Sequence, residues 1–358
     1  AAAVGGDTAF ANIVVPTVDT VRLGFVVDAL ARRRHPVMLV GSAGTGKTTL
    51  VRDYLRNLDE STLSATINMN FFTDAQSLQL QLEQPLDKRT GRVFGPPGNR
   101  RLVYFVDDLN MPAKETYGTQ TTSALLRQWM DYRSWYDRGD PSLKKTIVDV
   151  QFLSCMNHKA GSFLISPRLQ RHFFTLAVRM PSSADLTTIY STILGSHLAS
   201  FPAPVFALVD SLVAATIELH RTVSERFLPS AVKFHYLFTL REMAAVFQGL
   251  CKARGEHYAI PHKMIRLWLH ECTRVFSDRL VEPVELKQFE EIVLDVSKKH
   301  FEEEDQDALH AAPLLFTSFA TSHMADDASY LPVKPGQEGR DHLRDVLAAR
   351  LNEYNEST

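Results

Sequence analysis

The most informative segment of the chain reads Gly41-Ser42-Ala43-Gly44-Thr45-Gly46-Lys47-Thr48. It matches the whole phosphate-binding loop pattern G-x-x-x-x-G-K-[ST], in which glycines let backbone N–H groups turn inward around phosphate oxygens. The apolar run 35–40 before it predicts a short buried strand, and residues 48–58 after it predict a helix with one apolar face. A helix in that position points its positive N-terminal end at the same anion. The segment therefore predicts a nucleotide site.

Two side chains of this loop have specific expected roles. Lys47 is expected to reach the β- and γ-phosphates of a nucleotide, and the Thr48 hydroxyl is expected to bind Mg²⁺. The remaining contacts to the nucleotide are expected from the loop and the first helical turn, at Gly41, Ala43, Gly44, Thr45, Gly46 and Thr49.

A second nucleotide-site signature lies about sixty residues further on, in the run Leu102-Val103-Tyr104-Phe105-Val106-Asp107-Asp108. A buried strand that ends in an acidic pair places Asp107 at its carboxyl end, where a carboxylate can hold Mg²⁺ directly or through water. Many strands end in Asp, so this run alone is a weak signal. Together with the phosphate-binding loop that precedes it, the run is a strong signal for a nucleotide site.

Asp108 occupies the position where ATPases of this kind usually carry Glu, the base that orients the attacking water. Asp is one methylene shorter, so on an unchanged backbone its oxygens fall short by more than about 1 Å. A misplacement of that size can cost about 10²-fold in rate. We therefore expect nucleotide binding to be kept at this site, and turnover to depend on Asp108.

Further apolar runs complete an alternating pattern. Strands are expected at 63–69, 148–156 and 173–178, and helices at 20–33, 77–86 and 119–132. This alternation predicts a three-layer α/β domain with a parallel sheet. Asn157 follows one of the strands, so its amide is expected either to hydrogen-bond the γ-phosphate or the attacking water, or to form a turn ahead of Ala160-Gly161.

Three other segments of this domain are less specific. The extended segment 13–17, with Val14 and Val15, is expected either to pack on an adenine base or to cap the sheet. Residues 88–101 carry five positive charges in a turn-rich pattern, which favours a solvated hairpin over a contact with phosphate or an acidic partner. Residues 134–143 are expected to form a polar, turn-rich excursion.

The composition is that of a globular protein with a real core. Of the 358 residues, 45% are hydrophobic and 22% charged, and the net charge of −2 gives no electrostatic argument for nucleic acid or for a membrane surface. The three cysteines lack the spacing of a zinc site or a disulfide framework, so they are expected to be buried thiols in a reducing, cytoplasmic compartment. No apolar run reaches the roughly 18 residues that span a bilayer. The chain has no basic signal region and no initiator Met, which suggests a piece of something longer.

From Ser182 onward the pattern becomes helical, with candidates at 184–199, 205–227, 238–253, 263–280 and 283–300. We expect a large α/β nucleotide-binding domain at 1–181, a small helical lid domain at 182–300, and at 301–358 an acidic connector with the opening of another module, including a helix at 343–355. Arg241 is expected either to reach the phosphates from the lid or to form an ion pair with Glu242 or Glu271.

Together these residues resemble an AAA+ module of a dynein heavy chain, and the resemblance covers nearly the whole chain. The tail from about Ala308 resembles the lead-in to a fourth module. Several strings are similar to the third ring module of axonemal, outer-arm-type heavy chains: Gly95-Pro96-Pro97-Gly98, Phe105-Val106-Asp107-Asp108-Leu109-Asn110-Met111-Pro112, Tyr117-Gly118-Thr119-Gln120, His235-Tyr236-Leu237-Phe238 and Leu267-Trp268-Leu269-His270-Glu271.

The resemblance implies a role for each matching position. It implies that Asp107 is the Mg²⁺ residue, Asp108 the catalytic carboxylate, Asn157 the first sensor and Arg241 the second, while Val14 and Val15 match the loop that cups adenine. Arg171, with Arg168 as the second choice, matches the arginine finger that serves the preceding module's nucleotide.

The resemblance also implies partners and two competing functions. Expected cofactors are ATP or ADP and Mg²⁺; expected partners are the neighbouring modules, other dynein subunits and, indirectly, microtubules, in the axoneme of a cilium or flagellum. One hypothesis is slow ATP hydrolysis that gates communication between the main ATPase site, the linker and the stalk. The other is a regulatory module that holds nucleotide without hydrolysing it, and Asp108 separates the two.

Overall fold

The computed structural model describes residues 10, 13–158, 165–318, 330–334 and 336–357. The chain divides into two compact units, an α/β unit of Pro16–Pro181 and a helical unit that combines Ala1–Val15 with Ser182–Thr358. The Ala160-Gly161 turn predicted after Asn157 lies outside the described residues.

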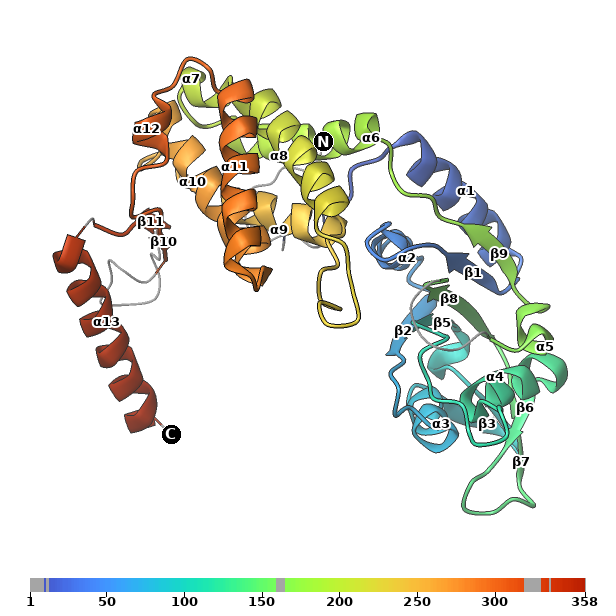
Figure 1. The fold of residues 1–358 in the computed structure, drawn as a ribbon. Coiled ribbons are helices and arrows are strands. Elements are labelled where there is room, and N and C mark those ends of the chain that lie inside the picture. The colour runs from blue at the N-terminus through green and yellow to red at the C-terminus, as the bar shows by residue number, and fades with distance from the viewer. Residues whose placement is uncertain (1–9, 11–12, 159–164, 319–329, 335, 358) are drawn as a thin grey trace. The chain divides into compact units, whose positions relative to one another are not determined.

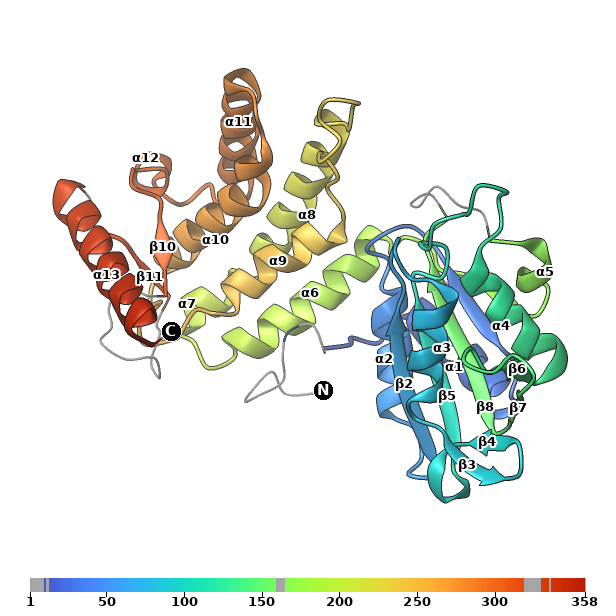
Figure 2. The ribbon, with the colours of Figure 1, turned by 90° about the horizontal axis from the view of Figure 1, so that it is seen from below.

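The α/β unit is built on a five-stranded sheet in the order β2-β5-β8-β1-β9, and every neighbouring pair is parallel. Its strands are β1 (Val37–Val40), β2 (Thr62–Asn68), β5 (Arg101–Asp107), β8 (Val150–Met156) and β9 (Phe174–Ala177). Figure 2 shows β2, β5 and β8 side by side. Because the strands are parallel, their carboxyl ends meet at one edge of the sheet.

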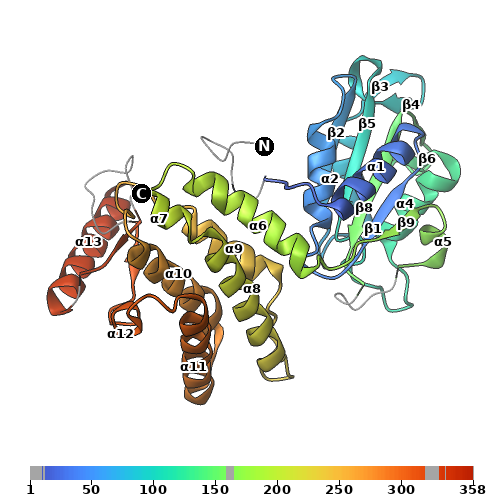
Figure 3. The same ribbon diagram turned by 90° about the horizontal axis from the view of Figure 1, so that it is seen from above.

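Helices cover both faces of this sheet, so its central strands are apolar on both sides. Residues of α1 (Val18–Arg32) and α2 (Lys47–Arg56) share a core with Val103 and Phe105 of β5. The alternate residues of β5, Leu102 among them, pack on the other face with α3 (Ala75–Glu83) and α4 (Thr121–Tyr132). Figure 3 shows α1 lying along one of these faces. The predicted three-layer α/β fold is confirmed.

A second sheet of four strands extends the α/β unit, in the order β3-β4-β7-β6. Its members are β3 (Asp87–Thr90), β4 (Val93–Gly95), β7 (Lys144–Ile147) and β6 (Ser134–Tyr136), and a 3-10 turn, η2 (Pro97–Asn99), follows β4. The hairpin expected within 88–101 is β3–β4. The polar, turn-rich excursion predicted at 134–143 is found at 137–143, but its first three residues form β6, which pairs with β7, and Trp135 is fully buried. The parallel pairing of β4 with β7 joins segments about fifty residues apart, and such pairing leaves no local signal.

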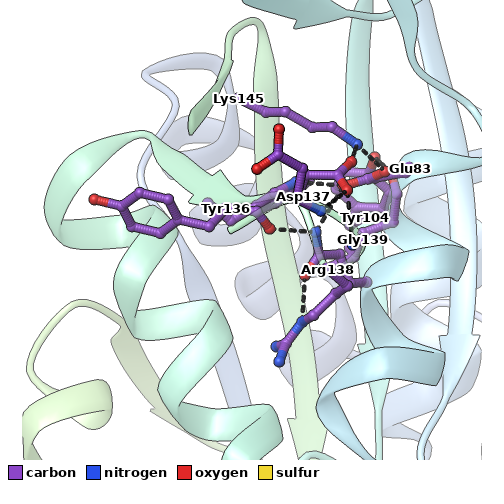
Figure 4. Close-up of polar contacts among 11 residues, drawn as sticks. Glu83, Tyr104, Tyr136, Asp137, Arg138, Gly139 and Lys145 are labelled. Carbon is purple, nitrogen blue, oxygen red and sulfur yellow. Dashed lines mark hydrogen bonds and ion pairs between the residues drawn. The ribbon is translucent and has the colours of Figure 1, made fainter. Parts of the chain in front are cut away.

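A polar network ties this second sheet to the end of α3 (Figure 4). Glu83 accepts hydrogen bonds from Trp135 Nε1 at 2.7 Å and from Lys145 Nζ at 2.8 Å. Lys145 also pairs with Asp137, and this hydrogen bond lowers the pKa of the Asp137 carboxyl. The Tyr104 hydroxyl, on β5, donates to the carbonyl of Leu82. The network connects the second sheet through α3 to the strand that ends in Asp107.

The helical unit is shown with its helices labelled in Figure 1. It contains α6 (Ser183–Leu198), α7 (Ala203–Phe206), α8 (Val209–Arg226), α9 (Leu240–Leu250), α10 (Pro261–Phe276), η3 (Ser277–Arg279), α11 (Pro283–His300), α12 (Gln306–Leu309) and α13 (Gly336–Ser357). The single helix predicted at 205–227 is two helices, because the Leu208 N–H bonds to Val205 and closes α7 as a tight turn. The helix predicted at 343–355 is longer at both ends.

The core of this unit is continuous around the fully buried Trp268 of α10. Phe316, in the short strand β10 (Phe316–Thr317), and Tyr330, directly before the short strand β11 (Leu331–Pro332), are buried in the same core. The domain boundary at residue 300 stays a prediction. Among the described residues, one stretch, Ala203–Arg226, is long and apolar enough to cross a membrane by length and composition, and most of it is the core helix α8.

Candidate nucleotide site

The phosphate-binding loop starts where β1 ends at the carboxyl edge of the sheet. The Gly41 N–H donates to the Met156 carbonyl of β8 at 3.3 Å, so the loop leaves the sheet beside that strand. A Cβ atom on Gly41 would lie 2.4 Å from the Val178 carbonyl oxygen, so only glycine fits there. Gly46, with φ +83°, is the N-cap of α2 and turns the chain into the helix. The loop is a backbone cradle at a helix N-terminus, which is the geometry that phosphate needs.

Lys47 lies inside this loop and is only 9% exposed. Its ammonium group donates to the carbonyls of Gly41 at 3.0 Å and Ser42 at 2.7 Å. A buried cation with this orientation keeps its positive charge inside the loop, next to the N-terminus of α2. The residues present therefore fit a phosphate group.

Thr48 and Asp107 meet although they are 59 residues apart, because α2 begins next to the end of β5. The Thr48 hydroxyl donates to Asp107 Oδ2 at 2.9 Å, and the Asp108 N–H donates to Asp107 Oδ1 at 3.1 Å. A hydroxyl and a carboxylate are the protein ligands that Mg²⁺ takes when phosphate oxygens supply the others. Among the described residues there is no group of three or more His, Cys, Asp or Glu side chains that could hold a metal by itself.

Asp108 is exposed and has a left-handed backbone, with φ +54°. Asp and Asn adopt this conformation more readily than longer side chains, which explains how a non-glycine residue is tolerated here. The predicted shortfall of the Asp108 oxygens relative to Glu applies to an unchanged backbone. With φ positive, the direction of the side chain is set by the turn as well as by its length.

Asn157 follows Met156 at the end of β8, level with the start of the loop, because Val40 and Met156 are register partners. Its carbonyl oxygen accepts a hydrogen bond from Asn110 Nδ2 at 2.9 Å. Asn110 lies in the turn after β5 and is 3% exposed. The described structure thus brings Lys47, Thr48, Asp107 and Asn157 to one edge of the sheet.

Cys155 is the neighbouring buried thiol on β8. Burial raises its pKa well above the usual value, and the negative charge of Asp107 acts in the same direction. The thiol is therefore neutral and acts as a packing residue at this edge.

Three expected residues of the nucleotide site belong to the helical unit. Val15 packs against the core of that unit. Arg241 is exposed on the first turn of α9, whose N-terminus is capped by Thr239 and Glu242. The ion pairs proposed for Arg241 are absent from the described residues, where Glu242 pairs with Arg279 at 2.8 Å and Glu271 with Arg274. Contact of Val14, Val15 and Arg241 with nucleotide stays a prediction.

Known protein families match segments of both units. The family described as the P-loop containing dynein motor region matches residues 3–181, and the AAA+ lid domain matches residues 212–311. The chain belongs to the dynein heavy-chain family.

Several dynein heavy chains are similar to this module over almost its whole length. The flagellar outer-arm beta chain of Chlamydomonas reinhardtii is 46% identical over 350 residues, which are 97% of this chain and 8% of that protein. The ciliary beta chain of Tripneustes gratilla is 44% identical over 96% of this chain, and human dynein axonemal heavy chain 17 is 42% identical over 96%. This module spans 8% of the length of each of these relatives.

The two candidate arginine fingers of this dynein module lie beside α4. Arg171, whose side chain is 63% exposed, pairs with Asp131 at 3.0 Å, and His172 contacts the same carboxylate at 2.9 Å. Arg168, on the short helix α5 (Pro167–Gln170), lines a cavity of about 570 Å³ together with Lys114 and Arg127. Both arginines are exposed on the α/β unit.

Asn110 is the residue of this edge that the sequence argument missed. An Asn three residues after an acidic strand end is typical of an ordinary turn. The signal that could have marked it is its place in the quoted string from Phe105 to Pro112, since a turn directly after β5 starts at the same sheet edge as the loop.

Proposed function

We propose that this chain corresponds to the third AAA+ module of a dynein motor ring, and that this module binds Mg-ATP and hydrolyses it slowly. The observation that carries this proposal is the 2.9 Å hydrogen bond between Thr48 and Asp107. It places the two side chains that such sites use for Mg²⁺ beside the loop that buries Lys47. No other edge of the described α/β unit combines a phosphate cradle, a cation and a strand-end carboxylate.

Binding is assigned first to the loop. Its backbone N–H groups and Lys47 would take the phosphates, while Thr48 and Asp107 would hold Mg²⁺. When bound, Mg²⁺ neutralises charge on the phosphate oxygens. Val14 and Val15 would contact the adenine, and Arg241 would approach the phosphates from the helical unit.

Hydrolysis is assigned to the two strand ends beside the loop. The Asp108 carboxylate would accept a hydrogen bond from a water molecule and orient its oxygen toward the γ-phosphorus, as the bond to the β-phosphate oxygen breaks. The Asn157 amide would hydrogen-bond the γ-phosphate or that water. Asp108 is one methylene shorter than Glu, which favours slow turnover.

A second candidate function is a module that holds nucleotide without hydrolysing it. The observation that favours it is the left-handed backbone of Asp108, φ +54°. In this conformation the chain turns away directly after β5, and the carboxylate is carried by a turn residue instead of a strand residue. In that case the module would act as a nucleotide-dependent structural switch.

The remaining parts of the proposal concern the whole motor. Arg171, or else Arg168, would act on the nucleotide of the preceding module, and a finger of this kind is worth about 10³–10⁵ in rate in other nucleotide hydrolases. The nucleotide state of this module would gate communication between the main ATPase site, the linker and the microtubule-binding stalk. The similar ciliary and flagellar chains support a place in an axoneme, with other dynein subunits as partners.

The test is nucleotide occupancy in the heavy chain that contains this module, with the loop lysines of the other modules replaced by Ala. We expect one Mg²⁺-dependent nucleotide per chain, and none after Lys47→Ala. Lys88→Ala, on the exposed strand β3, is the matched control and should bind as the parent does. Equal occupancy in the Lys47→Ala and parent chains would refute the proposed site.

A further inference from the structure

Asn110 connects the two strand ends that carry the proposed hydrolytic groups. Its Nδ2 atom donates to the Asn157 carbonyl oxygen at 2.9 Å, across 47 residues of sequence. Asn110 is 3% exposed and Asn157 is half-buried, so the donor end of this hydrogen bond lies away from water.

The turn that carries Asn110 is itself fixed. The Met111 N–H donates to the Asp108 carbonyl at 2.9 Å, and the Leu109 N–H donates to the Cys155 carbonyl of β8 at 3.1 Å. The left-handed backbone of Asp108 starts this turn, and the buried Leu109 side chain holds it against the sheet. Asn110 is therefore placed on a rigid turn that begins with Asp108.

We infer that Asn110 is a positioning residue, which sets the place of Asn157 relative to Asp107 and Asp108. The β5–β8 ladder pairs residues only as far as Val106 and Ser154. Beyond that level, hydrogen bonds from Leu109 and Asn110 continue to link the two strand ends. Without this hydrogen bond, the Asn157 carbonyl loses the Asn110 side chain as a donor. The backbone of Asn157 is then less constrained, and so is the side-chain amide of Asn157 that would hydrogen-bond the γ-phosphate.

The role of Asn110 rests on the proposed function, because Asn157 contacts nucleotide only there. The readout is therefore the ratio of the affinities for ATPγS and ADP, which measures contact with the third phosphate and needs no hydrolysis. A chain that binds both nucleotides but never hydrolyses ATP would refute slow turnover and still test Asn110.

The experiment uses the heavy chain with the other modules' loop lysines replaced by Ala, and fluorescent ADP and ATPγS as probes. We expect Asn110→Ala to lower the affinity ratio by about tenfold at most, the value of one buried hydrogen bond, with ADP affinity within about twofold of the parent. Asn157→Ala should lower the ratio as well. The double variant should be no lower than Asn157→Ala alone, because Asn110 acts through Asn157.

The matched control is Asn57→Ala. Asn57 makes the same kind of bond, from Nδ2 to the Asp53 carbonyl at 2.8 Å, but on the surface at the far end of α2. Its ratio should equal that of the parent. Asn110→Asp is the alternative if the Ala variant does not fold, because Asp keeps the side-chain volume of Asn. Its carboxylate replaces the amide donor with an acceptor facing the Asn157 carbonyl, so it should lower the affinity ratio at least as much. An unchanged ratio, or effects of Asn110→Ala and Asn157→Ala that add, would overturn the inference.

Discussion

Replacing Gly41 by Ala should damage the nucleotide loop through a single methyl group. The new Cβ would lie 2.4 Å from the Val178 carbonyl oxygen, and ordinary contact begins near 3.4 Å, so backbone must move by about 1 Å. The atom in the way belongs to the backbone, and the Val178 N–H bonds to Val40 at 2.8 Å, so neither side yields easily. Overpacking of this kind costs about 1–3 kcal/mol.

The expected result is a local effect at the end of β9 and in the loop. Amide hydrogen exchange in residues 37–41 and 174–178 should become about 5- to 150-fold faster, which is the same free energy expressed as an opening constant. ADP affinity should fall about tenfold or more, because backbone N–H groups of the loop are displaced.

Gly24→Ala is the matched control for Gly41→Ala. Gly24 lies inside α1, and a Cβ there would meet nothing within 4 Å. This variant should leave ADP affinity unchanged and stabilise α1 by about 0.5–1 kcal/mol. Parental exchange and ADP affinity in Gly41→Ala would refute the steric argument.

Three further outcomes follow from the described contacts. Asp107→Asn removes the negative charge beside Thr48, so the gain in ADP affinity on adding Mg²⁺ should fall at least tenfold. ADP titrations with and without Mg²⁺ measure this gain. Burial lowers the pKa values of His197, His220 and His270 in the helical unit. Below about pH 6.5 the unfolded chain therefore binds more protons than the folded chain, and the free energy of unfolding should fall as the pH drops. Urea titrations at pH 7.5 and 5.5 check this sign. Glu83→Ala should lower the local stability of the second sheet by about 1–3 kcal/mol, because Trp135 and Lys145 lose their acceptor. Amide hydrogen exchange should become faster in residues 134–147 and stay unchanged in residues 37–40.

The main sheet could be predicted because its signals are local. β5 and β8 are continuous apolar runs, since helices cover both faces, and a full phosphate-loop pattern fixed the order of β1 and α2. The same reasoning correctly placed Asp107 at a strand end, next to Thr48.

Of the second sheet, only the β3–β4 hairpin could be predicted, because the pairing of the other two strands leaves no local signal. Trp135 is the only apolar residue of β6 that is buried, and one buried residue in a three-residue strand has no periodicity. β6 pairs with β7, ten residues on, and β7 in turn pairs with β4, about fifty residues before it.

The details of the site also escaped prediction. The left-handed backbone of Asp108 depends on the whole turn after β5, and the bond from Asn110 to Asn157 joins two turns on different strands. Sequence alone showed which residue types were present at the strand ends, while tertiary contacts decide how they are oriented.

The most direct test of Asp108 as a working carboxylate is single-turnover decay of labelled ATP bound to this module, with the other sites of the heavy chain blocked. Asp108→Asn is the comparison, because Asn tolerates the same left-handed backbone and removes only the base. We predict that bound ATP becomes ADP within seconds to minutes in the parent, and about 10²-fold or more slowly in Asp108→Asn. Equal decay in the two chains, or ATP that persists in the parent, would contradict slow hydrolysis at this site.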